Sequence, residues 1–235
     1  MKLSALFALL ALAPLAMAET SPQSFRGEVT LKVGYNYLLS LPEGYEADTA
    51  RKWPLLVFLH GSGERGDNLE LLKVHGPHKL IAAGKKFEAI VVSPQVPNQN
   101  IWNAHGVKAL IDDLSKKHRV DTSRIYLTGI SMGGFGTWDT ALAYPDTFAA
   151  IVPICGGAGV GFVMADRIKD LPCWIFHGDK DGAVTVDNST RMHTALQKAG
   201  SAAKLTIYPG VGHNSWTQSY DNEELWTWLF AQKRG

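Results

Sequence analysis

Six short, almost wholly apolar runs recur along this sequence, and each ends in Gly, Ser, Pro or another polar residue. They are PLLVFLHG, EAIVVSPQ, RIYLTGIS, AAIVPICG, CWIFHGD and KLTIYPG. Strands that are buried on both faces have this pattern, whereas strands with one solvent face alternate apolar and polar residues. The runs therefore predict a mostly parallel sheet that is covered by helices.

Helical spacing of apolar residues fills the segments between and after these runs. The segments are VKALIDDLSKKH, FGTWDTALAY, STRMHTALQKAG and NEELWTWLFAQ, and Gly200 is a typical helix stop. Ahead of the first run, EVTLKV and YNYLLSLPEGY alternate or cluster apolar residues about Gly34, which predicts two antiparallel strands. We therefore predict an α/β protein with antiparallel N-terminal edge strands and helices on both faces of the sheet.

The first eighteen residues resemble a secretory signal peptide. Lys2 precedes an apolar stretch, and the small-x-small triplet AMA ends the segment at Ala18. Pro14 interrupts the stretch, which is shorter than the roughly 20 apolar residues of a membrane span. We expect residues 1–18 to be a signal peptide, with an uncleaved anchor as the alternative, and 19–235 to be one domain of a secreted or periplasmic protein.

The overall charge gives no reason to expect a polyanionic partner. Lys and Arg total 23 against 22 Asp and Glu, a net charge of +1 among 235 residues. Long-range attraction to nucleic acid or to an anionic membrane needs a marked excess of basic residues. We therefore expect neither as a partner, and the sequence leaves the oligomeric state open.

An exported protein can form disulfides, so the two cysteines need a prediction. Cys155 ends one predicted strand and Cys173 begins the next. If these strands are parallel neighbours, the two sulfurs lie roughly 10 Å or more apart, beyond the reach of a disulfide. We predict two buried free thiols.

A GxSxG motif lies between the predicted strand RIYLTG and the predicted helix that follows. It places Ser131 between Gly129 and Gly133. In a nucleophile elbow the serine has a strained backbone, and the residues two positions away come too close for side chains. We predict that Ser131 is a nucleophile and that the Met132 amide, at the start of the next helix, donates to an oxyanion.

A serine hydroxyl needs a base and an orienting acid, which follow it in this fold in the order Ser, acid, His. His213 follows the last strand, and HGDKDGAV, after the strand before it, offers Asp179 and Asp181. Either carboxylate fits this position. Carboxyl ends of strands in open α/β sheets are where such sites form.

The loop after VFLHG supplies small residues that let backbone amides approach a substrate oxygen. We favour the Ser62 amide as the second oxyanion donor, with Gly63 as the competing choice. Trp102 and Trp216 line the substrate pocket or else pack as ordinary aromatic residues, and the sequence does not decide between these roles.

The remaining histidines are interpreted as structural. His60 and His177 each precede a glycine at a strand end, where a packed, hydrogen-bonded ring is the usual arrangement. His75 and His78, in KVHGPH, lack helical ligand spacing, and no carboxylate cluster joins them or His105. We predict no metal site.

Four segments together resemble the α/β-hydrolase esterases grouped with the dienelactone hydrolases and with feruloyl esterase and polyhydroxybutyrate depolymerase relatives. They are FLHGSGERGDN, the long block RIYLTGISMGGFGTWDTALAYPDTFAAIVPICGG, WIFHGDKDGAV and GVGHNSW. The resemblance covers nearly the whole chain after residue 18. In the family's HGxxDxxV pattern the last carboxylate is the triad acid, which implies Asp181. Thr185 replaces a proline found in many relatives, and a serine stands where dienelactone hydrolases themselves use cysteine.

This resemblance implies a serine carboxylesterase that needs no cofactor. The stretch GGAGVGFVMADRIKDLP is too short for a separate cap domain, so we expect an open site. Feruloyl or acetyl esters of plant polysaccharide are the first substrates to try. The alternatives are a peptidase, since prolyl-peptidase catalytic domains share this fold, and a carbohydrate-binding protein with a relict site.

Overall fold

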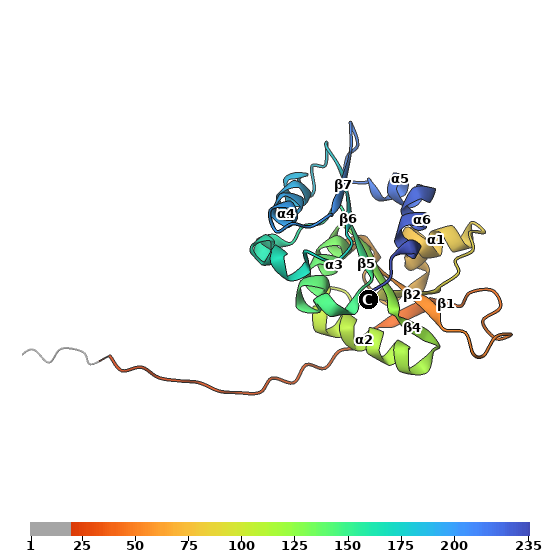
Figure 1. Ribbon diagram of the computed structural model, residues 1–235, viewed down its shortest axis with the longest axis horizontal. Helices are drawn as coiled ribbons and strands as arrows, with labels where there is room; N and C mark the ends of the chain where they lie inside the picture. Colours follow the sequence, from red (N-terminus) through yellow and green to blue (C-terminus); the bar gives the residue numbers. More distant parts are fainter. Residues whose placement is uncertain (1–19) are drawn as a thin grey trace, which may run out of the picture. The chain divides into compact units, whose positions relative to one another are not determined.

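The computed structural model describes residues 20–235, so the predicted signal peptide lies outside the described residues. Contacts divide the chain into one unit that ends at Lys32 and a second unit, Val33–Gly235. In the first unit, residues 20–32 form neither helix nor strand. Every element named below belongs to the second unit (Figure 1).

A seven-stranded sheet runs through the second unit in the order β1-β3-β2-β4-β5-β6-β7. Only β1 is antiparallel to its neighbour, β3, and the other pairs are parallel. This arrangement confirms the predicted fold class. The strands are β1 (Asn36–Ser40), β2 (Trp53–Leu59), β3 (Ile90–Gln95), β4 (Val120–Ile130), β5 (Ala150–Ile154), β6 (Trp174–Gly178) and β7 (Lys204–Tyr208).

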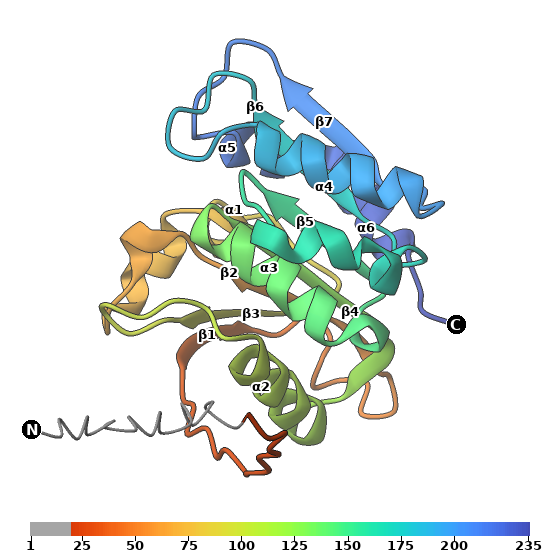
Figure 2. The ribbon, with the colours of Figure 1, turned by 90° about the vertical axis from the view of Figure 1, so that its left-hand side faces the viewer.

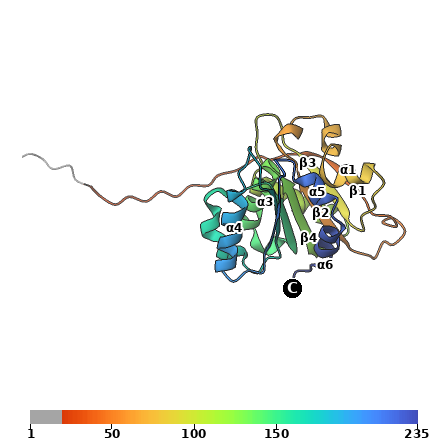
Figure 3. The ribbon, with the colours of Figure 1, turned by 90° about the horizontal axis from the view of Figure 1, so that it is seen from above.

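Helices cover both faces of this sheet. Figures 2 and 3 show α2, α3 and α4 on one face and α1, α5 and α6 on the other. The helices are α1 (Gly76–Ala82), α2 (Ala104–Lys117), α3 (Met132–Ala143), α4 (Asp187–Lys198), α5 (Trp216–Tyr220) and α6 (Glu223–Ala231). Four 3-10 helices lie in the connections: η1 (Ser62–Glu64), η2 (Leu69–Lys73), η3 (Pro145–Thr147) and η4 (Gly159–Ile168).

The central strand β2 explains why the apolar runs do not alternate with polar residues. Successive side chains of a strand point to opposite faces. Leu55 and Val57 belong to the core beneath α2 and α3, whereas Leu56 and Phe58 belong to the core beneath α6. Because a helix layer covers each face, both sets of positions must be apolar.

The predicted antiparallel strand pair at the N-terminus is wrong in its first half. Residues 28–33, EVTLKV, form no strand, and the Val29 side chain is 96% exposed. The second half forms β1, which pairs with β3 instead, so that Leu38 lies opposite Ser93. Alternation of apolar residues makes a segment suitable for a strand, but a strand forms only where another backbone offers hydrogen bonds.

The prediction of two free thiols is confirmed, since Cys155 and Cys173 are both buried and unpaired. Cys173 bridges to Ile151 at the start of β5, and Cys155 follows the end of that strand. The two sulfurs therefore lie toward opposite ends of neighbouring parallel strands.

Within residues 20–235, none of the helices combines the length and the hydrophobicity that crossing a membrane requires.

Candidate active site

Ser131 lies in a sharp turn between β4 and α3. Its backbone has φ +50° and ψ −117°, a conformation that residues with a side chain rarely adopt. A Cβ on Gly133 would lie 1.9 Å from the Leu59 carbonyl oxygen, and one on Gly129 would lie 2.2 Å from the Gly133 oxygen. The two glycines of GxSxG are therefore required by close backbone contacts around the turn.

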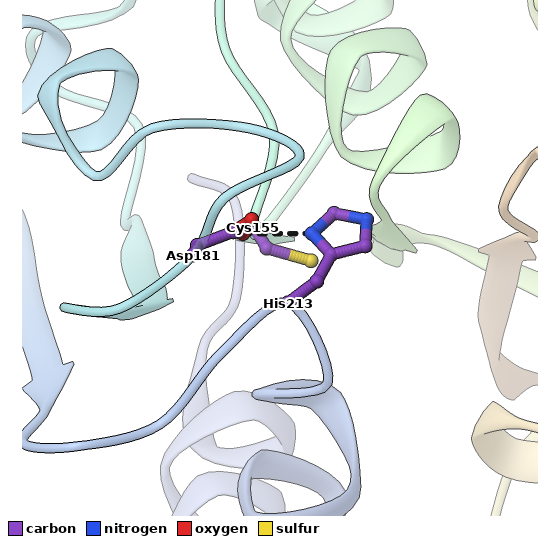
Figure 4. A group of neighbouring side chains, drawn as sticks. All are labelled: Cys155, Asp181 and His213. Carbon is purple, nitrogen blue, oxygen red and sulfur yellow. Dashed lines mark hydrogen bonds and ion pairs between the residues drawn. The ribbon is translucent and has the colours of Figure 1, made fainter.

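His213, in the loop after β7, connects Ser131 to Asp181. Its Nε2 atom lies 2.9 Å from the Ser131 hydroxyl oxygen, and its Nδ1 atom lies 2.7 Å from Asp181 Oδ2. Figure 4 shows the imidazole ring directed at the carboxylate. The structure thus brings together the three residues that the sequence proposed as serine, acid and base.

The Asp181 side chain is fully buried, and three hydrogen bonds reach its carboxylate. Burial by itself raises the pKa of this carboxyl group. The hydrogen bond with His213 and those from the Val184 and Ala183 amides to Oδ1, each 2.9 Å, outweigh burial and lower the pKa below its usual value. Asp181 therefore stays ionised, and its Oδ2 atom accepts a hydrogen bond from the Nδ1–H group of His213.

Asp179, the other candidate acid, has a different partner. Its Oδ1 atom accepts a hydrogen bond of 2.6 Å from the Gly210 amide. This bond holds the loop after β6 to the turn after β7. The geometry places Asp181, and not Asp179, against His213.

The two predicted oxyanion donors begin helices beside Ser131. Ser62 starts η1 just after β2, and a Cβ on the preceding Gly61 would lie 3.7 Å from Ser131 Cβ. Arg65 Nε donates to the Ser62 carbonyl oxygen at 2.9 Å, which holds this loop. Met132 is the first residue of α3, so its amide has no acceptor within the helix.

The two tryptophans differ in their positions. Trp216 is half-buried on α5 and meets the His213 ring edge to face, with centroids 5.3 Å apart. Trp102 is 5% exposed, and its indole N–H donates to the His60 carbonyl oxygen at 3.0 Å. Of the two roles left open for Trp102, its burial and this bond favour packing in the core behind the loop that begins at His60.

His177 contacts Asp181, which sequence reasoning missed. As expected for a structural residue it is buried, with Nδ1 bonded to the Ser189 hydroxyl and Nε2 to the Val184 carbonyl oxygen. The same Nε2 lies 3.2 Å from Asp181 Oδ2. The four-residue spacing of His177 and Asp181 in HGDKD could have indicated this contact, because the turn after β6 brings Asp181 back over the end of the strand.

Cys155 was also missed as a neighbour of the site. It follows β5 with a φ of +40°. Its Sγ atom, a carboxylate oxygen of Asp181 and a ring nitrogen of His213 all lie within 4.8 Å of one another (Figure 4).

Of the histidines weighed as ligands, His75 accepts a hydrogen bond from Trp216 and His78 bonds to Ser93.

Comparisons with known proteins give a consistent family. The model of the dienelactone hydrolase family matches residues 88–224. Poly(3-hydroxyalkanoate) depolymerase C of Paucimonas lemoignei is 31% identical over 134 residues, 50% of this chain and 30% of that protein. Probable feruloyl esterase C of Aspergillus terreus is 26% identical over 165 residues, 68% of this chain and 59% of that protein. A thermostable esterase of known structure shares 33% identity with a TM-score of 0.73, over 84% of this chain and 59% of the other.

The chain spans 22%, 30% and 19% of the first three curated relatives that it matches, so it resembles one part of each. The family match covers more than half of the 235 residues, and it includes the Ser131 turn, Asp181 and His213. The chain belongs to the dienelactone hydrolase family.

Proposed function

We propose that this protein is an exported serine carboxylesterase, with residues 19–235 as its catalytic domain. The observation that carries the proposal is the continuous hydrogen-bonded path from Ser131 Oγ through the His213 ring to Asp181 Oδ2. Membership in a family with esterase relatives supports ester hydrolysis over other chemistry. Export rests on the signal-like segment 1–18 alone.

In the proposed mechanism, His213 Nε2 takes the Ser131 hydroxyl proton as the oxygen attacks the ester carbonyl. Asp181 accepts a hydrogen bond from the Nδ1–H group of His213, and its negative charge stabilises the imidazolium that forms. The protonated ring then gives its proton to the departing alcohol, which leaves an acyl group on Ser131. A water molecule, activated by the same ring, releases the acid and restores the serine.

The tetrahedral intermediate carries a negative oxygen, and two amides are placed to receive it. Met132 offers its amide together with the positive end of the α3 dipole. We propose the Ser62 amide as the second donor, with Gly63 as the alternative. The Arg65 bond to the Ser62 carbonyl oxygen holds the peptide that carries the Gly63 amide, whereas the Ser62 amide belongs to the preceding peptide.

For the substrate, we propose accessible esters, among them feruloyl or acetyl groups on plant polysaccharide. The segment between β5 and β6 holds only the short helix η4 and its flanking residues. The His213 side chain remains 28% exposed, so a substrate can reach it from solvent. Trp216, beside His213, is proposed to contact the alcohol part of the ester. No cofactor takes part in this mechanism. Peptidase activity and carbohydrate binding without catalysis are the alternatives.

The proposal is tested with a fluorophosphonate probe and a substrate panel. Wild-type protein should become labelled on Ser131 and should hydrolyse nitrophenyl esters and feruloylated sugars in preference to peptides. Ser131→Ala should lose labelling and nearly all turnover, because it lacks the attacking oxygen. Circular dichroism should match the wild type, since the change removes one hydroxyl and opens no core cavity.

Ser24→Ala is the matched control, because this serine is exposed and lies outside the second unit. It should label and turn over substrate like the wild type. Retention of most esterase activity by Ser131→Ala would contradict the proposal. Preference for peptides would support the peptidase alternative, and failure of wild-type protein to label would support a non-catalytic binding protein.

A further inference from the structure

Cys155 places a thiol beside the hydrogen bond that joins Asp181 and His213. Its sulfur, the Asp181 carboxylate and the His213 ring come from the ends of β5, β6 and β7, and Figure 4 shows the sulfur next to the bond between the other two. Thiolate, carboxylate and imidazole are all ligands that Zn²⁺ accepts. The proposed esterase mechanism uses only two of these three groups.

The distances fit a single ion with small movements. Ligand atoms on one tetrahedral Zn²⁺ lie roughly 3.3–3.8 Å apart. The three atoms here are within 4.8 Å of one another, and the bond from His213 to Asp181 would open from 2.7 Å. The required shifts are thus on the order of 1 Å.

A fourth polar group lies close to His213 in the sequence. Ser215, two residues after His213, is fully buried. Its hydroxyl has no hydrogen-bond partner among the described residues. A buried hydroxyl without a conventional acceptor or donor is unusual, and an ion or its bound water would satisfy it.

We propose that Cys155, Asp181 and His213 form an inhibitory site for a thiophilic divalent cation such as Zn²⁺. The ion is an inhibitor here and takes no part in ester hydrolysis. No metal site was predicted from the sequence, where only the histidines were weighed as ligands. The present site needs a cysteine that only the fold brings to His213.

The balance of charges favours the bound state, although the Cys155 thiol, whose pKa burial raises to about 12, must lose its proton. On binding, the Cys155 thiol releases its proton to solvent, so a thiolate and the Asp181 carboxylate balance the two positive charges of the ion. His213 coordinates through Nδ1, and the proton that this atom carried moves to Nε2. The buried site is then neutral overall, which avoids the large penalty of an unpaired buried charge.

The movement of the ring proton to Nε2 explains why the bound ion would inhibit ester hydrolysis. With a proton on Nε2, the ring donates a hydrogen bond to Ser131 and can no longer accept the hydroxyl proton. This part of the inference rests on the proposed function. Metal binding itself does not, because it depends only on the three side chains.

Access to the site passes His213. Its side chain is 28% exposed, whereas the side chain of Asp181 and the whole of Cys155 are fully buried. The ion must therefore displace the His213 ring slightly on entry, and we expect inhibition to develop slowly after mixing.

The test combines binding, spectroscopy and inhibition on the full-length protein after any natural processing. Zn²⁺ should bind with one equivalent in equilibrium dialysis and inhibit nitrophenyl ester hydrolysis, and EDTA should restore the rate. Co²⁺ should give the near-ultraviolet thiolate charge-transfer band of a cysteine-bound ion. Cys155→Ser should lose that band and raise the inhibition constant about tenfold or more, measured relative to its own uninhibited rate.

Cys173→Ser is the matched control, because this thiol is equally buried but lies at the opposite end of the neighbouring strand. It should keep both the Co²⁺ band and Zn²⁺ inhibition. If Cys155→Ser fails to fold, the wild-type Co²⁺ spectrum decides. A spectrum without a thiolate band, or Zn²⁺ inhibition unchanged in a folded Cys155→Ser protein, overturns the proposal.

These outcomes are separable from the failure of the proposed function. If the wild type has no esterase activity, the dialysis and Co²⁺ measurements still test the metal site. If the protein is an esterase that binds no thiolate-coordinated metal, only the metal site is wrong.

Discussion

Asp179 and Asp181 are two residues apart in one turn, yet they have different tasks. Asp179 accepts the Gly210 amide and ties two loops together. Asp181 accepts from two amides of its own turn and from His213. The chemistry of the side chain is the same in both positions, so only the direction in which the turn carries each carboxylate separates them.

Exchanging these carboxylates for amides should separate the two tasks. Asp181→Asn should lower kcat/KM by about 10³- to 10⁴-fold, because an amide favours the wrong histidine tautomer and gives no charge to the imidazolium. Asp179→Asn, the matched control, should lower it only modestly, since an amide oxygen still accepts from Gly210. Steady-state kinetics with a nitrophenyl ester provides the measurement. A larger loss in Asp179→Asn would exchange the two assignments.

The sequence predicts those site residues that belong to a local pattern, and it does not predict those whose neighbours come from distant segments. Ser131 and His213 were identified because a glycine-flanked serine and a loop histidine after a strand are local patterns. The choice of Asp181 needed the family resemblance, because both aspartates occupy the same turn. The role of Trp102 stayed open and Cys155 was not considered as a neighbour of the site, because the surroundings of both residues come from segments distant in the chain.

At the scale of elements, the turn from β4 into α3 depends on how closely it approaches β2. A Cβ at position 133 would overlap the Leu59 carbonyl, which belongs to the backbone and cannot move without disturbing the centre of the sheet. Gly34, in contrast, has open space around it, because a Cβ there would meet nothing within 4 Å. Replacement by alanine should therefore have opposite consequences at these two glycines: a backbone clash at Gly133 and no new contact at Gly34.

Gly133→Ala should destabilise the protein by more than about 4 kcal/mol or prevent folding, because a backbone clash in the core has no cheap relaxation. Gly34→Ala should stay within roughly 0.5 kcal/mol of the wild type, since no contact is made. Urea unfolding followed by fluorescence gives both values. A Gly133→Ala protein as stable as the wild type would mean that the turn is wider than described.

The six apolar runs were predicted correctly as strands, and the segments with helical spacing of apolar residues were predicted correctly as α2, α3, α4 and α6. The short helices α1 and α5 were not predicted, since five to seven residues hold too few turns to show a period. The segment EVTLKV had the pattern of a strand but lacks a neighbouring strand in the structure. The pattern of apolar residues thus identifies segments that can form strands, and hydrogen bonding to a neighbouring strand decides which of them do.

Considering the molecule as a whole, two buried histidines are kept neutral by the fold. Burial lowers the pKa of His60 to about 4 and that of His78 to about 4 as well. His60 Nε2 accepts the Val96 amide, and His78 Nδ1 bonds to the Ser93 hydroxyl. Both rings flank β3, so their protonation would charge the interior of the sheet.

Stability should therefore fall as the pH decreases from about 6.5 to about 4. In this window the unfolded chain binds a proton at each histidine and the folded chain does not, so each contributes about 1.4 kcal/mol of loss per pH unit. The contribution is fully present above pH 6.5. Denaturant midpoints at pH 7 and pH 5 provide the measurement. His78→Gln should reduce the slope, whereas His105→Gln, at an exposed position on α2, should not.

Equal stability of the wild type at pH 7 and pH 5 would contradict this prediction, because it would mean that neither ring is protected from protonation in the folded state.

The order of the strands also bears on how the chain assembles during synthesis. β1 and β2 are made first, but they do not pair with each other, because β3 lies between them. β2 receives its second neighbour only with β4, which ends at residue 130. The first half of a growing chain therefore holds strands without a complete set of partners, and its most apolar strand stays uncovered longest. We expect such a nascent chain to remain extended and to need protection from chaperones until its second half has emerged.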